Sequence, residues 1–415
     1  MKYGLDFGTS NSTISFCDGH TITLLPVEKE TSTPEIMPSL WYFDDIEKKW
    51  YFGRDAFIEY KDNGGDGRFI QSVKKLLADK KYTGTHIGYR FYSLEKLVEL
   101  YFREIKHRAD KIVGKNVRAI TIGRPVRFSR DLHDDIAQTR LDTAARNAGF
   151  EEIDFILEPL AATYSLKNKI TEPTLVFTID IGGGTTDVSI VRLTPPGAGP
   201  SRILSTNGIS AGGMDFTSEI MRNRLLPYFG WGTTYRSIFN KEMAFPRYAL
   251  RHITDWYNSL KMIHNKQFMD FLKEVKRTTS NPERIECLEE LVFEKLGLDI
   301  FMAIESAKVA LSRDEAATVE YRQGAIDIQE GVKRFEFEQY IESYANEISA
   351  MIDASLRQVE SAFRKMDVVV MVGGSSRIPL LKRIVENKFP AIPVVKTDIY
   401  ASVAYGLSAA ANLRE

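Results

Sequence analysis

One short pattern occurs twice in this 415-residue chain and constrains its fold more than any other feature. Residues 4–10 (GLDFGTS) resemble residues 178–186 (TIDIGGGTT): each copy is an apolar strand, then an aspartate, then a glycine turn with hydroxyl side chains. Residues 159–164 and 402–410 form a second similar pair, rich in small residues that let helices pack closely. The repeats predict two similar lobes that face each other across one cleft.

Composition narrows the class of protein. The chain is 43% hydrophobic and 27% charged, which fits a folded protein with a sizeable core. Its net charge of −1 argues against nucleic acid or an anionic membrane as the main partner. Two cysteines exclude a disulfide framework. No apolar segment is long enough for a membrane span and the N-terminus has no apolar signal core, so we expect a cytoplasmic protein.

The remaining pattern predicts a mixture of strands and helices. Apolar spacing predicts helices over 94–112 and 131–149, and a further helix that opens at Pro159. Buried strands are predicted at 119–122, 175–179 and 368–372. Residues 221–311 and 335–363 are helical in pattern.

The glycine turns suggest a polyphosphate site. A turn without Cβ atoms lets backbone N–H groups converge on an anion, and neighbouring hydroxyls add donors. Asp6 and Asp180 at the strand ends would repel phosphate, but they can hold a hydrated Mg²⁺ that bridges phosphate oxygens. The pattern is neither a P-loop nor a dinucleotide fingerprint.

A third glycine turn follows the predicted strand 368–372. Gly373 and Gly374 offer flat backbone on which a planar base could lie, and Arg377 could stack on that base. Ser375 or Ser376 would cap the following helix. An ordinary strand-to-helix turn with a solvated arginine explains the same residues equally well.

Taken together, these motifs resemble one known family. The two turns, Glu158-Pro159, Gly212-Gly213 and the segment 372–379 resemble, in order and spacing, the nucleotide-binding domain of the DnaK family of seventy-kilodalton heat-shock chaperones. The resemblance covers nearly the whole chain. It implies an actin-like (ribonuclease H-like) α/β fold of two lobes, each with a mixed five-stranded sheet flanked by helices. It further implies a short, stand-alone form (YegD-like) without the peptide-binding domain.

The resemblance also implies domain bounds. Lobe I would span 1–168, with an outer subdomain at about 26–114. Lobe II would span 169–415, with an enlarged helical outer subdomain at about 223–313 and a final helix 400–415 that packs back toward lobe I.

The resemblance assigns roles to individual residues around ATP or ADP and Mg²⁺. Lys74 would stabilise charge at the γ-phosphate, Glu158 would orient or deprotonate the attacking water, and Thr185 would sit near the γ-phosphate. Asp6 and Asp180 would hold Mg²⁺ through water, with Asp187 behind them. The remaining nucleotide-binding residues would be Gly8, Thr9, Ser10, Asn11, Gly182, Gly183, Gly184, Thr186, Gly212, Gly213, Glu305, Lys308, Ser312, Gly373, Gly374, Ser375 and Arg377.

Two features depart from the family. Val309 replaces an arginine that helps to hold adenine, and Tyr400 falls where an acidic residue is usual, so the strength of the adenine preference stays open. The segment 223–300 is an enlarged, aromatic-rich insertion that includes Trp256 and Tyr257. It forms either a larger local core or a surface for a protein client or co-chaperone.

We therefore expect a slow ATPase whose output is lobe closure, in a chaperone-related protein. A nucleotide-gated binding module without useful turnover is the main alternative, and retention of Lys74, Glu158 and Thr185 argues against it. A sugar kinase or a filament-forming actin homologue ranks lower, because the sequence contains no suitable base motif and no charge pattern that demands a filament.

Overall fold

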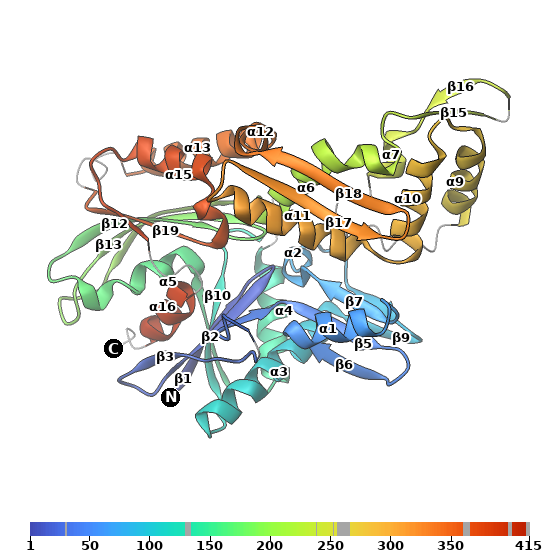
Figure 1. Cartoon of the computed structure of the whole chain (residues 1–415). Helices are drawn as coiled ribbons and strands as arrows, with labels where there is room; N and C mark the ends of the chain where they lie inside the picture. The colour runs from blue at the N-terminus through green and yellow to red at the C-terminus, as the bar shows by residue number, and fades with distance from the viewer. Residues whose placement is uncertain are drawn as a thin grey trace. The chain divides into compact units, whose positions relative to one another are not determined.

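Figure 1 shows the chain as a computed structural model, which describes residues 1–29, 31–128, 134–237, 239–251, 253–254, 266–359, 366–396 and 401–411. The chain divides into two compact units. Unit 1 comprises residues 1–213, 345–377 and 381–415, and unit 2 comprises residues 214–344 and 378–380. Tyr400, Trp256 and Tyr257 lie outside the described residues.

The first sheet of unit 1 contains the first aspartate–glycine pattern. Its strand order is β11-β10-β1-β2-β3, and β4 (Ile36–Pro38) also pairs with β2. β1 runs parallel to β10 and antiparallel to β2, so the sheet is mixed as predicted. The strands of the main path are β1 (Lys2–Phe7), β2 (Asn11–Cys17), β3 (Ile22–Leu24), β10 (Ala119–Arg124) and β11 (Glu152–Leu157).

The second sheet of unit 1 repeats this topology. Its order is β14-β13-β12-β19-β20, with β12 parallel to β19 and antiparallel to β13. β12 therefore occupies the place of β1, and the internal repeat is confirmed as a structural repeat. The strands are β12 (Thr174–Ile181), β13 (Thr186–Leu193), β14 (Arg202–Ile209), β19 (Val368–Val372) and β20 (Val394–Lys396).

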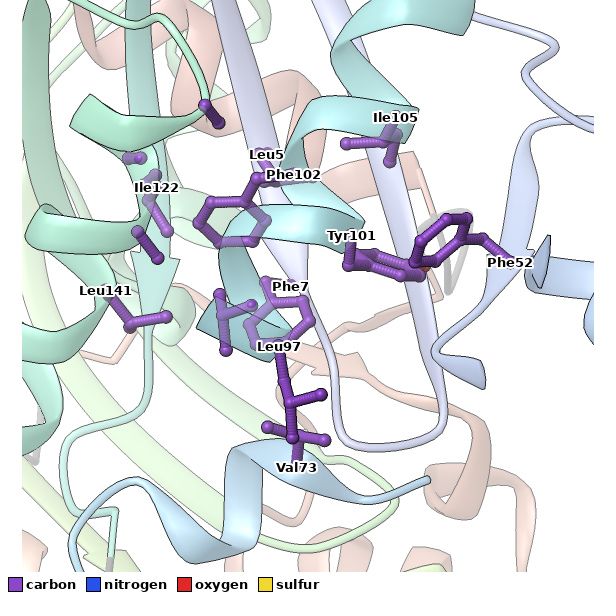
Figure 2. Close-up of a cluster of buried hydrophobic side chains, with 14 of the residues drawn as sticks. Leu5, Phe7, Phe52, Val73, Leu97, Tyr101, Phe102, Ile105, Ile122 and Leu141 are labelled. Atoms are coloured by element: carbon purple, nitrogen blue, oxygen red, sulfur yellow. The ribbon is translucent and has the colours of Figure 1, made fainter. Parts of the chain in front are cut away.

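Successive side chains of β1 point to opposite faces of the sheet, and only one of these faces belongs to the apolar core. Leu5 and Phe7 belong to a buried cluster that also includes residues of α3 (Leu94–Val113) and α4 (Asp134–Asn147) (Figure 2). Gly4 lies on the other face, where a Cβ atom would be 2.7 Å from the backbone of α16 (Ala401–Ala411). Asp6 shares that face, because side chains alternate along a strand.

Two helices rich in small residues cross on that face. α5 (Glu158–Tyr164) and α16 lie side by side (Figure 1). They approach so closely that a Cβ atom at Gly406 would be 1.7 Å from the carbonyl oxygen of Ala161. Ser15 of β2 donates a hydrogen bond to the Ala404 carbonyl at 2.6 Å, and its hydroxyl lies 2.8 Å from that of Ser408. The last described helix of the chain thus covers its first strands.

Shorter elements complete unit 1. Near the N-terminal sheet lie β5 (Leu40–Asp44), β6 (Lys49–Phe52), α1 (Gly53–Asp62), β7 (Arg68–Gln71), α2 (Val73–Leu76), β8 (Gly84–Ile87) and β9 (Arg90–Ser93). A 3₁₀ turn Lys167–Lys169 follows α5. Toward the C-terminus lie a 3₁₀ turn Gly374–Arg377 and α15 (Pro379–Lys388), whose first two residues belong to unit 2. α13 (Glu342–Arg357) continues from unit 2 into unit 1.

Unit 2 is less uniformly helical than the sequence suggested. The helical pattern over 221–311 is interrupted by a hairpin of β15 (Thr234–Arg236) and β16 (Glu242–Ala244). The other strands, β17 (Ala316–Gln323) and β18 (Ile326–Lys333), pair with each other. The helical segments are α6 (Gly213–Ile220), a π-helix Met221–Leu225, a 3₁₀ turn Leu226–Phe229, α7 (Arg247–Leu250), α9 (Lys266–Thr278), α10 (Pro282–Phe293), α11 (Gly297–Leu311) and α12 (Arg334–Tyr340).

The helical stretch predicted over 335–363 is present through Arg357 as two helices rather than one, and residues 360–363 lie outside the described residues. α12 ends at Tyr340 and α13 begins at Glu342, because Ile341 between them leaves helical geometry with φ −98° and ψ 7°. Ile341 is fully buried, so the break turns an apolar side chain into the core. No helix among the described residues is both long enough and apolar enough to cross a membrane.

Candidate functional site

The first glycine turn connects β1 to β2 and is folded tightly on itself. A Cβ atom at Gly8 would be 2.1 Å from the Asn11 carbonyl oxygen, so only glycine fits there. Ser39 holds the turn from outside: its hydroxyl donates to the Gly8 carbonyl at 2.8 Å and its N–H to the Ser10 carbonyl at 2.8 Å. Ser39 thus bonds to two carbonyls of the turn, while Ser10 itself remains exposed to solvent.

The second glycine turn connects β12 to β13 in the same way. The Gly182 N–H donates to the Thr185 carbonyl at 2.9 Å, and the Gly182 carbonyl accepts from the Gly213 N–H at 2.9 Å. Gly212 packs on the turn so closely that its Cβ would be 2.7 Å from the Gly182 carbonyl oxygen. Gly182, Gly212 and Gly213 therefore lie together in the fold.

The two turns lie against each other. A Cβ atom at Gly183 would be 2.4 Å from the Ser10 hydroxyl, and one at Gly184 would be 2.7 Å from the Thr9 hydroxyl. Equivalent ends of two equivalent sheets thus bring two sets of backbone N–H groups and hydroxyls to one place. Such an arrangement suits an anion with several phosphate groups.

A buried ion pair lies in the same unit. Lys74 of α2 and Glu158, the first residue of α5, are 2.6 Å apart between Nζ and Oε1. Their side chains are only 6% and 8% exposed. Glu158 lies beside Gly123 of β10, where a Cβ atom would be 3.2 Å from the Glu158 Cγ. The glycine therefore makes room for the carboxylate beside β1.

Four carboxylates surround this single ammonium group. Burial away from water raises the pKa of Asp6 to about 7, and the negative charge of Glu158 contributes to this rise. The positive charge of Lys74 lowers the same pKa but does not cancel the rise. Burial and the charge of Glu158 also raise the pKa of Asp187 to about 8 and hold that of Asp180 well above its ordinary value. Burial alone would lower the pKa of Lys74, but the charges of Glu158 and Asp6 raise it.

This cluster has the chemistry of a site for a hydrated divalent cation. Carboxyl groups outnumber the ammonium group, carboxylate oxygen is the ligand type that Mg²⁺ prefers, and a bound cation would favour the charged form of these acids. Among the described residues no three acidic, histidine or cysteine side chains converge closely enough to ligate a metal directly. Since Mg²⁺ keeps several of its waters, contact of Asp6 and Asp180 through water fits this donor set.

Asp187 of β13 connects the second sheet of unit 1 to the segment that follows β10 of the first sheet. Its Oδ1 accepts a hydrogen bond from the Val126 N–H at 2.8 Å, and it also accepts one from the Thr185 side chain. It pairs with Asp180 across β12 and β13, so both carboxylates face the same side of the sheet. Thr185 is thereby linked to the acidic cluster through its hydroxyl.

The third glycine turn, at Gly373, packs closely against the end of β12. Gly373 has φ +80°, and a Cβ atom there would be 2.3 Å from the Ile181 carbonyl oxygen and 2.5 Å from Asp180. Glycine at this position thus lets β19 end beside β12. Ser375 donates to the Gly182 carbonyl at 3.4 Å, whereas Gly374 and Arg377 begin and end the 3₁₀ turn. The proposed stacking of a base on Arg377 stays a prediction.

The adenosine-binding residues expected from the family resemblance lie on α11 in unit 2. Lys308 Nζ is 2.7 Å from Glu305 Oε2, and the Thr217 hydroxyl donates to the same oxygen at 2.6 Å. Lys308 is buried, whereas Val309 beside it is 49% exposed. Ser312 lies one turn further on, with its hydroxyl 3.5 Å from the Lys308 carbonyl.

Sequence reasoning missed three supporting residues. Ser39 bonds to the first turn, and Arg140 of α4 bonds to the chain that follows Lys74. Neither belongs to a motif, and each reaches the site from a distant part of the chain. Thr217 was also missed, although its position four residues after Gly213 places it on the first turns of α6.

Two duplicated mixed sheets whose first hairpins present abutting glycine turns define the actin-like ATPase class of fold. The Hsp70 family model matches residues 68–230 and 289–414, well over half of the chain. The chain belongs to the Hsp70 family. Members of this family bind ATP or ADP with Mg²⁺ and are ATPases.

Individual relatives are distant but match along most of the chain. A chaperone protein DnaK from Mycoplasmopsis agalactiae is 25% identical over 92% of this chain and 54% of its own length. The chloroplastic heat shock 70 kDa protein 7 of Arabidopsis thaliana is 24% identical over 99% of this chain and 52% of its own. A chaperone protein HscA homolog from Haemophilus influenzae is 22% identical over 100% of this chain and 58% of its own. The chain spans about half the length of these curated relatives.

Proposed function

We propose that this chain binds ATP with Mg²⁺ in unit 1 and hydrolyses it slowly, with closure of its lobes as the output. The observation that carries the proposal is the contact between the two glycine turns, Gly183 on Ser10 and Gly184 on Thr9, in the unit that also contains the Lys74–Glu158 pair. Family membership supports nucleotide and Mg²⁺ as the ligands. A cytoplasmic location stays a prediction, because the relatives include chloroplast proteins.

The binding residues follow from this proposal. Backbone N–H groups of residues 8–11 and 182–185 would hold the phosphates, and the hydroxyls of Thr9, Ser10 and Thr185 would add donors. Mg²⁺ held through water by Asp6 and Asp180 would neutralise charge on the phosphate oxygens. In unit 2, Glu305 and Lys308 would bind the ribose hydroxyls and Ser312 the base, as the family resemblance implies.

The chemistry then needs only positioning and charge neutralisation. Glu158 would orient or deprotonate the attacking water, and Lys74 would neutralise the charge that spreads over the transferred phosphoryl group. Because the two side chains are already 2.6 Å apart, a water molecule near one carboxylate oxygen of Glu158 is also near the ammonium of Lys74. Glu158 would therefore supply the acid–base group and Lys74 the cation, side by side.

The first test measures phosphate release from ATP under single-turnover conditions, with the wild-type chain in excess over the nucleotide. We expect release above background with Mg²⁺ and none when EDTA removes the metal. The proposed adenosine-binding residues are tested in parallel by measuring whether ADP stays bound to the protein. If ADP and ATP bind but no phosphate is released with Mg²⁺, the non-hydrolysing, nucleotide-gated binding module replaces the ATPase.

The aromatic insertion supports a further proposal about partners. Its described aromatic residues include two contrasting groups. Phe245 and Phe268 are buried, and Phe245 stacks on Phe271, whereas Phe239 and Tyr248 are 86% and 66% exposed. The first group supports the alternative of a larger local core. The second group lies in residues 231–251, where four basic side chains accompany one acidic side chain. An acidic segment with apolar side chains complements this surface.

We propose that residues 231–251 bind such an acidic, apolar polypeptide segment as client or co-chaperone. The test measures fluorescence anisotropy of a labelled acidic, leucine-rich peptide. The double variant with Phe239→Ser and Tyr248→Ser is expected to weaken binding at least about tenfold, since exposed aromatic anchors dominate such interfaces. Phosphate release should stay at the wild-type rate. Equal binding by the double variant, or equal binding of a basic peptide of the same apolar content, would contradict this proposal.

A further inference from the structure

Arg140 is a buried arginine whose position in α4 no nucleotide-binding motif explains. Its guanidinium donates to the Leu77 carbonyl at 2.8 Å, to the Asp79 carbonyl at 3.1 Å and to the Leu76 carbonyl at 3.4 Å. Its Nε lies 3.2 Å from Glu95 of α3. Only 8% of Arg140 is exposed. One side chain thus fastens the end of α2 to both α3 and α4.

α2 needs such support because it is very short. It comprises only Val73–Leu76, and a single turn is not stable by itself in water. Its preceding residue, Ser72, has φ +58°, a conformation that costs a non-glycine residue free energy. The carbonyls at the end of a helix also have no partner within the helix. Arg140 supplies partners for the carbonyls that follow Lys74.

Apolar contacts hold one side of α2. Val73 is buried in the same cluster as Leu141, the neighbour of Arg140 (Figure 2). Leu77 belongs to that cluster too. These contacts set how deep the helix lies. Hydrogen bonds hold the end of the helix as well. The Leu76 carbonyl accepts from the Asp79 N–H at 3.1 Å, and Arg140 adds the bonds to the Leu77 and Asp79 carbonyls.

We propose that Arg140 is a positioning residue that keeps α2 in the orientation in which the Lys74 ammonium meets Glu158 and the transferred phosphoryl group. This inference rests on the proposed ATPase function, in which Lys74 is the catalytic cation. Arg140 acts through Lys74 and does not itself contact the nucleotide.

The experiment is a double-mutant cycle on phosphate release at saturating ATP and Mg²⁺. Arg140→Ala is expected to lower the rate about 10- to 100-fold, because a small displacement of a catalytic group has effects of this size. In a Lys74→Ala background the same change should alter the residual rate less than about twofold, since the group that Arg140 positions is gone. ATP affinity should stay near the wild-type value in both backgrounds.

Arg146→Ala is the matched control on the same helix. Arg146 is exposed and its ion pair is with Asp142 of α4 itself, at 2.8 Å. Its removal should leave hydrolysis unchanged. An Arg140→Ala variant that hydrolyses ATP like the wild type, or that loses the same factor in both Lys74 backgrounds, would overturn the positioning role.

Hydrogen exchange separates failure of this inference from failure of the ATPase proposal. Without nucleotide, Arg140→Ala should speed amide exchange in residues 73–79 while leaving the rest of unit 1 protected. This readout does not depend on turnover. Unchanged exchange in that segment overturns the inference even if the wild type hydrolyses ATP. If the wild type does not hydrolyse ATP, faster exchange confined to that segment still shows that Arg140 holds α2, and the failure then belongs to the ATPase proposal.

Discussion

Replacing Lys74 with alanine is expected to lower the rate of phosphate release about 10²- to 10³-fold, the usual effect of removing one group that stabilises transition-state charge. The reason lies in the charge balance of the cluster. Lys74 is the ammonium among four carboxylates, and the pKa of Lys74 is raised by Glu158 and Asp6, so it stays charged at neutral pH. Single-turnover phosphate release with Mg²⁺ measures the effect, and ATP affinity is measured separately.

The neighbouring lysines provide the comparison. Lys75 also comes near the second turn, with its Cε 2.8 Å from where a Cβ of Gly184 would lie, and it is the rival for the catalytic role. Lys80 is exposed and serves as the control. We expect Lys75→Ala to retain most of the rate and Lys80→Ala all of it. Full activity in a folded Lys74→Ala variant would remove Lys74 from the mechanism, and loss of activity only in Lys75→Ala would transfer the role.

Gly406→Ala is expected to be the most destabilising single substitution among the small residues of α16. The added methyl carbon would be 1.7 Å from the Ala161 carbonyl oxygen, so α5 and α16 must move apart. That movement also pulls on the hydrogen bonds between Ser15 and α16. We expect a loss of about 4 kcal/mol or more in the free energy of unfolding, or a failure to fold. Urea unfolding followed by circular dichroism measures it.

Gly331→Ala is the matched glycine control. It lies in β18, and a Cβ atom there would have no neighbour within 4 Å. Its urea midpoint should stay within about 0.3 M of the wild type, whereas that of Gly406→Ala should fall by about 1 M or more. If the two variants unfold at the same midpoint, the close crossing of α5 and α16 does not limit stability.

The repeated turns were predictable because their chemistry is local. An apolar strand, an aspartate and a glycine turn follow one another in sequence, and the turn geometry needs glycine within the same few residues. The equivalence of β1 and β12 followed from the repeat and is confirmed by the shared strand order. The roles of the turn residues toward nucleotide stay predictions, because they concern a ligand rather than the fold.

The supports of the site could not be predicted in this way. Ser39 reaches Gly8 across 31 positions and Arg140 reaches Leu77 across 63, so no local pattern connects them. The hairpin of β15 and β16 was missed because its strands have only three residues each, too few for alternation to be recognised. The break at Ile341 was missed because an apolar residue continues a helical pattern as well as it fills a core.

The position of α16 has a consequence for how the chain is made. Ser15 and Ser408 meet although 393 positions separate them. At about 5–20 residues per second, the ribosome needs roughly 20–80 s to travel that distance. During this time one face of the N-terminal sheet lacks the helix that covers it in the finished protein. The first strands of this chain are therefore uncovered on that face through most of its synthesis.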